Sequence, residues 1–206
     1  MTLTFLDRFR PHRRDQILPV FEGLAQVRAY WEGLRKDGML PVREAIDPRG
    51  LSGVLDRVFL ATRIAPGLVQ VSLAGSGISA LAGMDLRGLP LSCLFAADSR
   101  PLLAQALERV LSEATIAELD LGVDRGIPGA MVARLLLLPL ADQAGGKLVL
   151  GALSHANGRQ GQGKFQILAR REERMVIPPR TVPDEGIPMV EPIRRFGHLS
   201  LVHSCE

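Results

Sequence analysis

The stretch TIAELDLGVDRGIPGAMVARLLLLPLADQAGGKLVLGALS, residues 115–154, decides the fold. It holds three runs rich in aliphatic residues, 115–123, 130–140 and 147–154, separated by short segments of Gly, Asp or Pro that are typical of turns. Connections this short join antiparallel neighbours, because a parallel crossover needs about a dozen residues or more. The stretch therefore predicts three consecutive antiparallel strands.

Two further strands are predicted upstream, over residues 57–65 and 68–74, because Pro66-Gly67 between them is a hairpin signal. The second run alternates, with Val69, Val71 and Leu73 toward one face and Gln70 and Ser72 toward the other. Such alternation indicates a strand with one buried face.

Helical patterns lie between the two groups of strands. Gly75-Ser76-Gly77 opens a short helix that reaches about Ala82, and Asp98 or Ser99 can cap a longer helix. The apolar stripe of the longer helix consists of Leu102, Leu103, Ala106, Leu107, Val110 and Leu111. These helices are expected to cover one face of the sheet.

An amphipathic helix is predicted over residues 16–36, ending at Asp37-Gly38. Its apolar residues are Ile17, Leu18, Phe21, Leu24, Val27, Trp31 and Leu34. The other face of the sheet needs a cover, and this helix is available. The predicted fold is therefore α+β: a five-stranded antiparallel sheet with helices inserted between strands 2 and 3, plus an N-terminal amphipathic helix. Strands with one long helix also describe hot-dog and cystatin-like folds, which stay open as alternatives.

The chain has 206 residues, enough for one domain with extensions. We expect the domain at residues 16–155, a basic arm at 1–15, and a charged, Pro-rich extension at 156–206. Within that extension, Arg170, Arg171 and Arg174 beside Glu172 and Glu173 predict a solvated charged stretch.

The positive charge lies at the two ends, because residues 1–15 hold four Arg and two Asp, and 155–206 hold eight basic and six acidic residues. Residues 16–154 hold thirteen basic and fourteen acidic residues, which brings the net charge to +3. A nucleic-acid-binding domain concentrates positive charge on a folded face. The pattern therefore argues against nucleic acid as a partner. A nucleic-acid-linked regulator that uses the basic ends remains an alternative.

The two cysteines, Cys93 and Cys205, lie far apart, and residues 1–15 contain no secretory apolar segment. The longest apolar run, 135–138, is far below the roughly 20 residues of a membrane span. We expect a cytoplasmic protein with reduced thiols and no membrane contact.

The order of elements resembles a PAS domain. The residues that carry the resemblance are Trp31, Arg35, Gly38, Pro41, Arg43, Asp47, Pro48, Leu55, Phe59, Leu60, Ala74, Gly75 and the turn Gly83-x-Asp85-Leu86-Arg87-Gly88. Over about residues 20–155 the chain is similar to short stand-alone PAS-like proteins of alphaproteobacteria. The resemblance implies a sensory or protein-interaction module in bacterial signalling, without catalysis of its own, that senses a small molecule or binds a signalling partner.

A small apolar ligand is expected between the sheet and the segment 78–111, because the lining there is Leu, Ala, Met and Val. The predicted contacts are Ile78, Leu81, Leu94, Leu103 and Leu107, with Arg134 as an anchor for an anionic group in the same cavity. Arg134 reaching from its strand to solvent is the alternative. Glu118 and Asp120 alternate with apolar residues and are interpreted as a solvent face.

A homodimer is predicted through the N-terminal helix, whose apolar face exceeds what a five-stranded sheet obviously covers. The expected interface residues are Val20, Phe21, Leu24, Val27 and Trp31.

Several cofactor sites are weighed. The motif Gly75-x-Gly77-x-x-Ala80, with Asp98 about twenty residues on, fits a nucleotide-dependent enzyme, but the strands that follow lack the alternation of a dinucleotide-binding fold. The resemblance to PAS domains implies that a haem ligand would be a histidine on the helices between the second and third strands, and residues 75–114 contain none. It also implies an Asn-Cys-Arg-Phe motif for a flavin, and the sequence around Cys93 lacks it, so both cofactors are disfavoured. His198, His203 and Cys205 lack the spacing of a structural zinc site, so no metal is expected.

Overall fold

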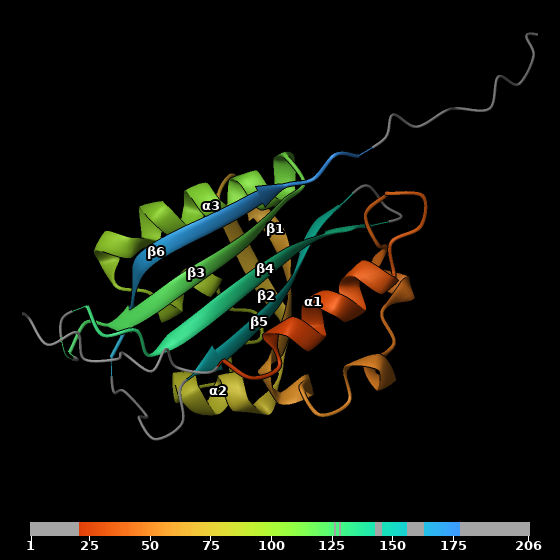
Figure 1. The fold of residues 1–206 in the computed structure, drawn as a ribbon. Coiled ribbons are helices and arrows are strands. Elements are labelled where there is room, and N and C mark those ends of the chain that lie inside the picture. Colours follow the sequence, from red (N-terminus) through yellow and green to blue (C-terminus); the bar gives the residue numbers. More distant parts are fainter. Residues whose placement is uncertain (1–20, 126, 128, 143–145, 156–162, 178–206) are drawn as a thin grey trace, which may run out of the picture.

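The structure is a computed structural model that describes residues 21–125, 127, 129–142, 146–155 and 163–177. The basic arm, Val20, His198, His203 and Cys205 lie outside these ranges. One six-stranded sheet forms the centre, in the order β2-β1-β5-β4-β3-β6 (Figure 1). Its strands are β1 (Val58–Ala65), β2 (Leu68–Ala74), β3 (Thr115–Val123), β4 (Ala133–Ala141), β5 (Lys147–His155) and β6 (Phe165–Arg174). All five strand pairs are antiparallel.

The α+β class is confirmed, and so are the five predicted strands, but the sheet contains a sixth. Strand β6 lies in the part of the chain that the sequence predicts to be a solvated extension. It pairs with β3 along nine residues of that strand. The prediction of a five-stranded sheet is wrong because β6 ends in Arg and Glu, which hide the alternation that marks a half-buried strand.

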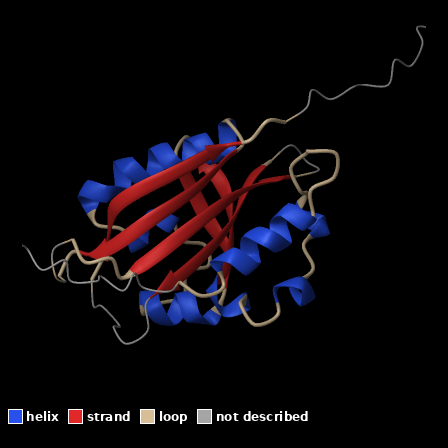
Figure 2. Cartoon of the chain, viewed as in Figure 1, coloured by secondary structure: helices blue, strands red, loops and turns tan. Residues whose placement is uncertain are grey.

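The inner face of the sheet is covered by the helices inserted between β2 and β3 (Figure 2). They are α2 (Ser76–Ala82), the 3-10 turns η4 (Leu91–Leu94) and η5 (Ala97–Ser99), and α3 (Arg100–Ser112). We call the buried residues between these helices and the sheet the inner cluster. It includes Phe59, Val69, Val71, Ile78, Leu91, Leu94, Phe95, Leu103, Leu107, Leu119, Leu135, Leu137, Val149, Leu153 and Phe165.

The outer face is covered at its centre by α1 (Leu24–Gly33), which packs on β4 and β5 as expected for the N-terminal helix. The predicted bounds of 16–36 are too wide, because Gly23, with a positive φ of 84°, precedes the first helical residue, and the helix ends at Gly33. In Figure 1 this helix lies in front of the sheet, with α3 behind it. We call the apolar residues on this face the outer cluster. It includes Leu24, Val27, Trp31, Leu51, Val54, Val58, Ile116, Leu136, Leu138, Leu140, Leu148, Leu150 and Ala152.

The sequence motif that begins at Trp31 holds α1 to the sheet. The Trp31 indole Nε1 donates a hydrogen bond of 2.9 Å to the Pro139 carbonyl in β4. The Arg35 guanidinium lies 5.6 Å from the Trp31 ring and donates to the Gly38 carbonyl at 2.6 Å. Pro41 accepts a hydrogen bond from the Ala141 backbone at the end of β4. The residues of this motif therefore have a structural role, because they attach α1 and the loop that follows it to β4.

The β1–β2 hairpin is fixed to α3 by Glu108. This carboxylate accepts two hydrogen bonds from Arg63 and one from the Gly67 backbone, with distances between 2.9 and 3.1 Å. Hydrogen bonds from Ser112 and the Gly67 backbone lower the pKa of Glu108 below its ordinary value. Because Arg63 reaches α3, its side chain lies on the inner face, and Ile64 beside it lies at a register shift between Arg63 and Ala65.

Candidate functional site

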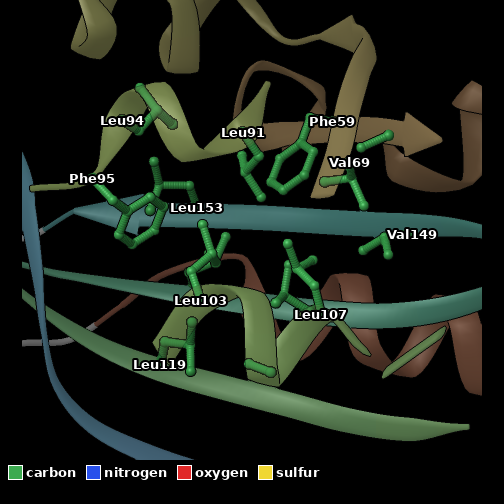
Figure 3. Packing of buried hydrophobic residues seen from close by; sticks show 14 of the residues in the cluster. Phe59, Val69, Leu91, Leu94, Phe95, Leu103, Leu107, Leu119, Val149 and Leu153 are labelled. Atoms are coloured by element: carbon green, nitrogen blue, oxygen red, sulfur yellow. The ribbon is translucent and has the colours of Figure 1, made fainter. Parts of the chain in front are cut away.

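The five apolar residues among the predicted ligand contacts lie where expected, between the sheet and the inserted helices. Ile78, Leu94, Leu103 and Leu107 are buried members of the inner cluster, and Leu81 packs against it. Figure 3 shows Leu103 and Leu107 of α3 directed toward Leu153 and neighbouring strand residues. These side chains pack as the hydrophobic core that joins the helices to the sheet. Their role as ligand contacts stays a prediction.

Arg134 lies on the opposite face of the sheet, so its predicted placement in the same cavity is wrong. Its neighbours of like orientation in β4, Leu136 and Leu138, belong to the outer cluster. The Arg134 Nε donates to the Asp120 carboxylate at 2.7 Å, and its guanidinium lies 5.1 Å from the Phe21 ring. Strand alternation places Arg134 on the same face as Leu136 and Leu138. The sequence does not show whether α1 or the inserted helices cover that face.

Asp120 is the centre of an ion-pair cluster, which corrects its interpretation as part of a solvent face. The residue is only 8% exposed. Arg171 of β6 donates two hydrogen bonds to its carboxylate, at 2.9 and 3.0 Å, in addition to the one from Arg134. Burial acts to raise the pKa of Asp120, but the hydrogen bonds from Arg171 and Arg134 outweigh it and hold the pKa below its ordinary value.

The glycines of the nucleotide motif serve internal packing. A Cβ at Gly75 would come within 2.2 Å of the Leu55 carbonyl, and one at Gly77 within 2.9 Å of the Asp56 carbonyl. These contacts bring α2 against the 3-10 turn η3 (Leu55–Arg57). The strand after the motif, β3, pairs antiparallel with both of its neighbours. The parallel unit that a dinucleotide site requires is therefore missing from the described sheet, and the nucleotide-enzyme alternative loses its basis.

The predicted dimer interface is also wrong for the helix residues that the structure describes. Leu24, Val27 and Trp31 are buried against the sheet of their own chain. Phe21 packs partly against the same cluster. Because these side chains already have partners within the monomer, they are not free to cover a second copy.

A different apolar surface is left open, on the outer face of β1 and β2. Ile64 is 51% exposed and Leu73 is 52% exposed. A bulge shifts the register between Leu60 and Ala61, so that Leu73 pairs with Leu60, which packs against the outer cluster. Leu73 therefore points outward, opposite to Val69 and Val71, whereas the sequence predicts one common face. The sequence pattern carries no signal for this bulge.

We call this surface the hairpin patch. It consists of Leu60, Thr62, Ile64, Gln70, Ser72 and Leu73, none of which is charged. Helix α1 packs on β4 and β5, two strands that lie on one side of β1 in the sheet order. A surface that exposes two large apolar side chains, Ile64 and Leu73, and contains no charged residue is typical of a contact surface for another protein.

A hollow of about 500 Å³ lies at the corner between α3 and β3. It is lined by Ser112, Glu113, Ala114, Arg174, Met175, Val176 and Ile177, none of them a predicted ligand contact. Ala114 has a positive φ of 49° there, a conformation that disfavours residues with a Cβ.

The described residues contain neither a metal-binding cluster nor a membrane-spanning helix. Within the residues that the structure describes, no group of three or more His, Cys, Asp or Glu side chains is arranged to hold a metal ion. No helix in the same ranges has the length and apolarity needed to cross a bilayer.

Comparison with known proteins gives one match. The family model described as a PAS domain matches residues 21–154. No curated protein and no solved structure matches the chain at a significant level. The matched range begins just before α1 and ends in β5, so it includes five strands of the sheet and leaves β6 outside.

Proposed function

The chain belongs to the PAS domain family, and on that premise we propose that it is a protein-interaction module of a bacterial signalling system and acts as a homodimer. The family supports a signalling or sensory role. The proposed interface is the hairpin patch in place of the apolar face of α1. We further propose that the protein is cytoplasmic and has no catalytic activity of its own.

The observation that carries this proposal is the exposure of Ile64 and Leu73 on a part of the sheet without charged side chains. In a two-fold dimer the same patch meets itself, so a charged residue in it would be buried twice in one interface. A patch without charges avoids the cost of burying unpaired ions. Two hairpin patches can therefore pack together and remove four large apolar side chains from water.

Small-ligand sensing has less support. The side chains predicted to contact a ligand are packed in the inner cluster, where they already fill the space between α3 and the sheet. A ligand there would have to displace core contacts. Native mass spectrometry of the purified protein distinguishes the two roles, because a retained small molecule of constant mass would favour sensing.

Sedimentation equilibrium over a range of protein concentrations tests the interface. We expect the wild-type chain to dimerise and the double variant Ile64→Lys/Leu73→Lys to be monomeric, because the new ammonium groups would face each other across the two-fold axis. Ile127→Lys is the matched control, since Ile127 is 59% exposed and lies in the turn between β3 and β4. A wild-type monomer at all concentrations, or a double variant that still dimerises, would refute this interface.

A further inference from the structure

Strand β6 changes character along its length. Its start is anchored by apolar contacts: the Phe165 ring lies 6.1 Å from that of Phe95, and Ile167 packs against the inner cluster. Backbone groups add to this, because the Ala96 N–H donates to the Phe165 carbonyl at 2.9 Å and the Ile167 N–H donates to the Ser99 hydroxyl at 3.0 Å. Residues 165–167 are therefore held in the same way as the other strands.

After a register shift, where Asp120 pairs with Ala169 and Leu121 with Ile167, every residue from 170 to 174 is charged. We call this part, Arg-Arg-Glu-Glu-Arg, the charged end of β6. It carries no apolar side chain to either face of the sheet. Beyond its backbone ladder with β3, the side-chain contacts that attach it to the described residues are ion pairs, among them Arg171 with Asp120 at 2.9 Å.

Two adjacent glutamates tie the charged end to helices on opposite faces. Glu172 accepts a hydrogen bond of 2.6 Å from Arg109 of α3, on the inner face. Glu173 pairs with Arg28 of α1, on the outer face. Figure 1 shows β6 at the edge of the sheet, beside β3 and near α3. The charged end thus connects both covering helices at the sheet edge.

The ion pairs that reach the two helices are largely exposed, whereas the Arg171 pair with Asp120 is more buried, because the Asp120 side chain is only 10% exposed. The side chains of Arg28, Arg109 and Glu173 are about one third to three fifths exposed, with values of 32%, 46% and 61%. Exposed ion pairs contribute little to stability and are screened by salt. In addition, the Arg170 Nη1 is buried without a hydrogen-bond partner, which costs free energy in the attached state, whereas the Glu172 Oε1 lies 3.1 Å from the Arg170 Nε in an ion pair.

We propose that the charged end of β6 is a releasable strand end, which detaches from β3 when its contacts with Arg28, Arg109 and Asp120 are broken. Met175, which packs against the outer cluster, leaves with it, as do Val176 and Ile177. Detachment therefore uncovers the backbone edge of β3 and removes four of the seven residues that line the corner hollow. An acidic partner surface favours the released state, because it competes with Glu172 and Glu173 for the two arginines.

Hydrogen exchange of the full chain, followed by mass spectrometry at low and at high sodium chloride, tests the proposal. In the charged end, we expect high salt to speed exchange of the amides that bond to β3 by roughly tenfold, the effect of weakening two exposed ion pairs. Amides of residues 165–167 and of β5 should keep their rates. The double variant Glu172→Gln/Glu173→Gln should show the faster exchange already at low salt.

Two variants make the result specific. Asp85→Asn is the control, because the Asp85 pair with Arg87 lies in a turn away from β6 and should leave the charged end unchanged. Exchanging the charges, Arg28→Glu with Glu173→Arg, should restore slow exchange relative to Glu173→Arg alone. The proposal fails if the charged end exchanges at the same rate in both salts, or if β5 accelerates equally. The same measurement on the Ile64→Lys/Leu73→Lys variant, which is expected to be monomeric, shows whether the exchange rates of the charged end depend on the dimer interface.

Discussion

Strands β4 and β6 flank β3 on its two sides, and they are attached to the molecule by different side chains. β4 places Leu136, Leu138 and Leu140 under α1 and Leu135 and Leu137 under α3, so both of its faces are buried in apolar contacts. β6 has an apolar start and a charged end. Backbone hydrogen bonds pair both strands with β3. Only β4 is held along its whole length by apolar side chains buried on both faces of the sheet.

The largest effect is expected at the apolar centre. Trp31→Ala should lower the free energy of unfolding by about 3–5 kcal/mol, because it removes a large buried side chain and leaves the Pro139 carbonyl without its donor. Equilibrium unfolding in urea measures this. Trp31→Phe keeps most of the apolar contact and should lose clearly less. A loss below about 1 kcal/mol for Trp31→Ala would show that α1 does not hold the centre of the sheet.

An intermediate effect is expected where the two regions meet, at Asp120. Asp120→Asn keeps the shape of the side chain but removes the charge between Arg134 and Arg171, so we expect a loss of about 1–2 kcal/mol at neutral pH. Because the pKa of Asp120 is lowered in the folded state, its stabilisation is complete above the unfolded value of about 4 and is lost as the pH falls through the folded value.

The pH dependence is the check on this prediction. The difference in unfolding free energy between wild type and Asp120→Asn should shrink as the pH is lowered below about 4. Asp85→Asn is again the comparison, since both partners of the Asp85 pair are exposed and the variant should leave the free energy of unfolding nearly unchanged. A difference that stays constant with pH would mean that the carboxylate charge does not stabilise this junction.

The smallest effect is expected at the corner where β6 ends. Ala114 has a positive φ, so Ala114→Gly should raise the free energy of unfolding by about 0.5–1 kcal/mol. Ala106→Gly is the control of opposite sign, because Ala106 is buried in the middle of α3, where glycine should cost about 1 kcal/mol or more. Thermal unfolding of the two variants side by side measures both. A destabilised Ala114→Gly variant would show that the corner carries no backbone strain.

Hydrophobic patterning was sufficient for most of the fold. The hairpin signal at Pro66-Gly67 for β1 and β2, the aliphatic runs in β3 to β5 and the stripe of α3 identify elements that bury apolar side chains, and these elements are confirmed. β6 was missed because ionic contacts and backbone hydrogen bonds attach its charged end, and neither leaves a periodic apolar signal. The exposure of Leu73 was missed because it depends on a bulge, which is a property of the pairing between two strands.

The candidate sites show the same limit. The sequence identified apolar residues between the sheet and the inserted helices, but it could not distinguish a ligand cavity from a packed core, because both have the same composition. It identified Trp31 and Leu24 as an apolar face that needs a cover, and their own sheet is that cover. Arg134 contacts Phe21 and Asp120 directly, and Asp120 in turn binds Arg171. These three residues lie in segments far apart in the sequence.

By itself, the sequence determined the α+β class, the succession of the first five strands along the chain and the helices that cover them. These follow from local periodicity and from the lengths of the connections. Only the tertiary structure decided which apolar face is buried, which remains open as the hairpin patch, and that a run of five charged residues completes the sheet. Those outcomes depend on which distant side chains meet, and no local pattern in one chain segment encodes its partner in another.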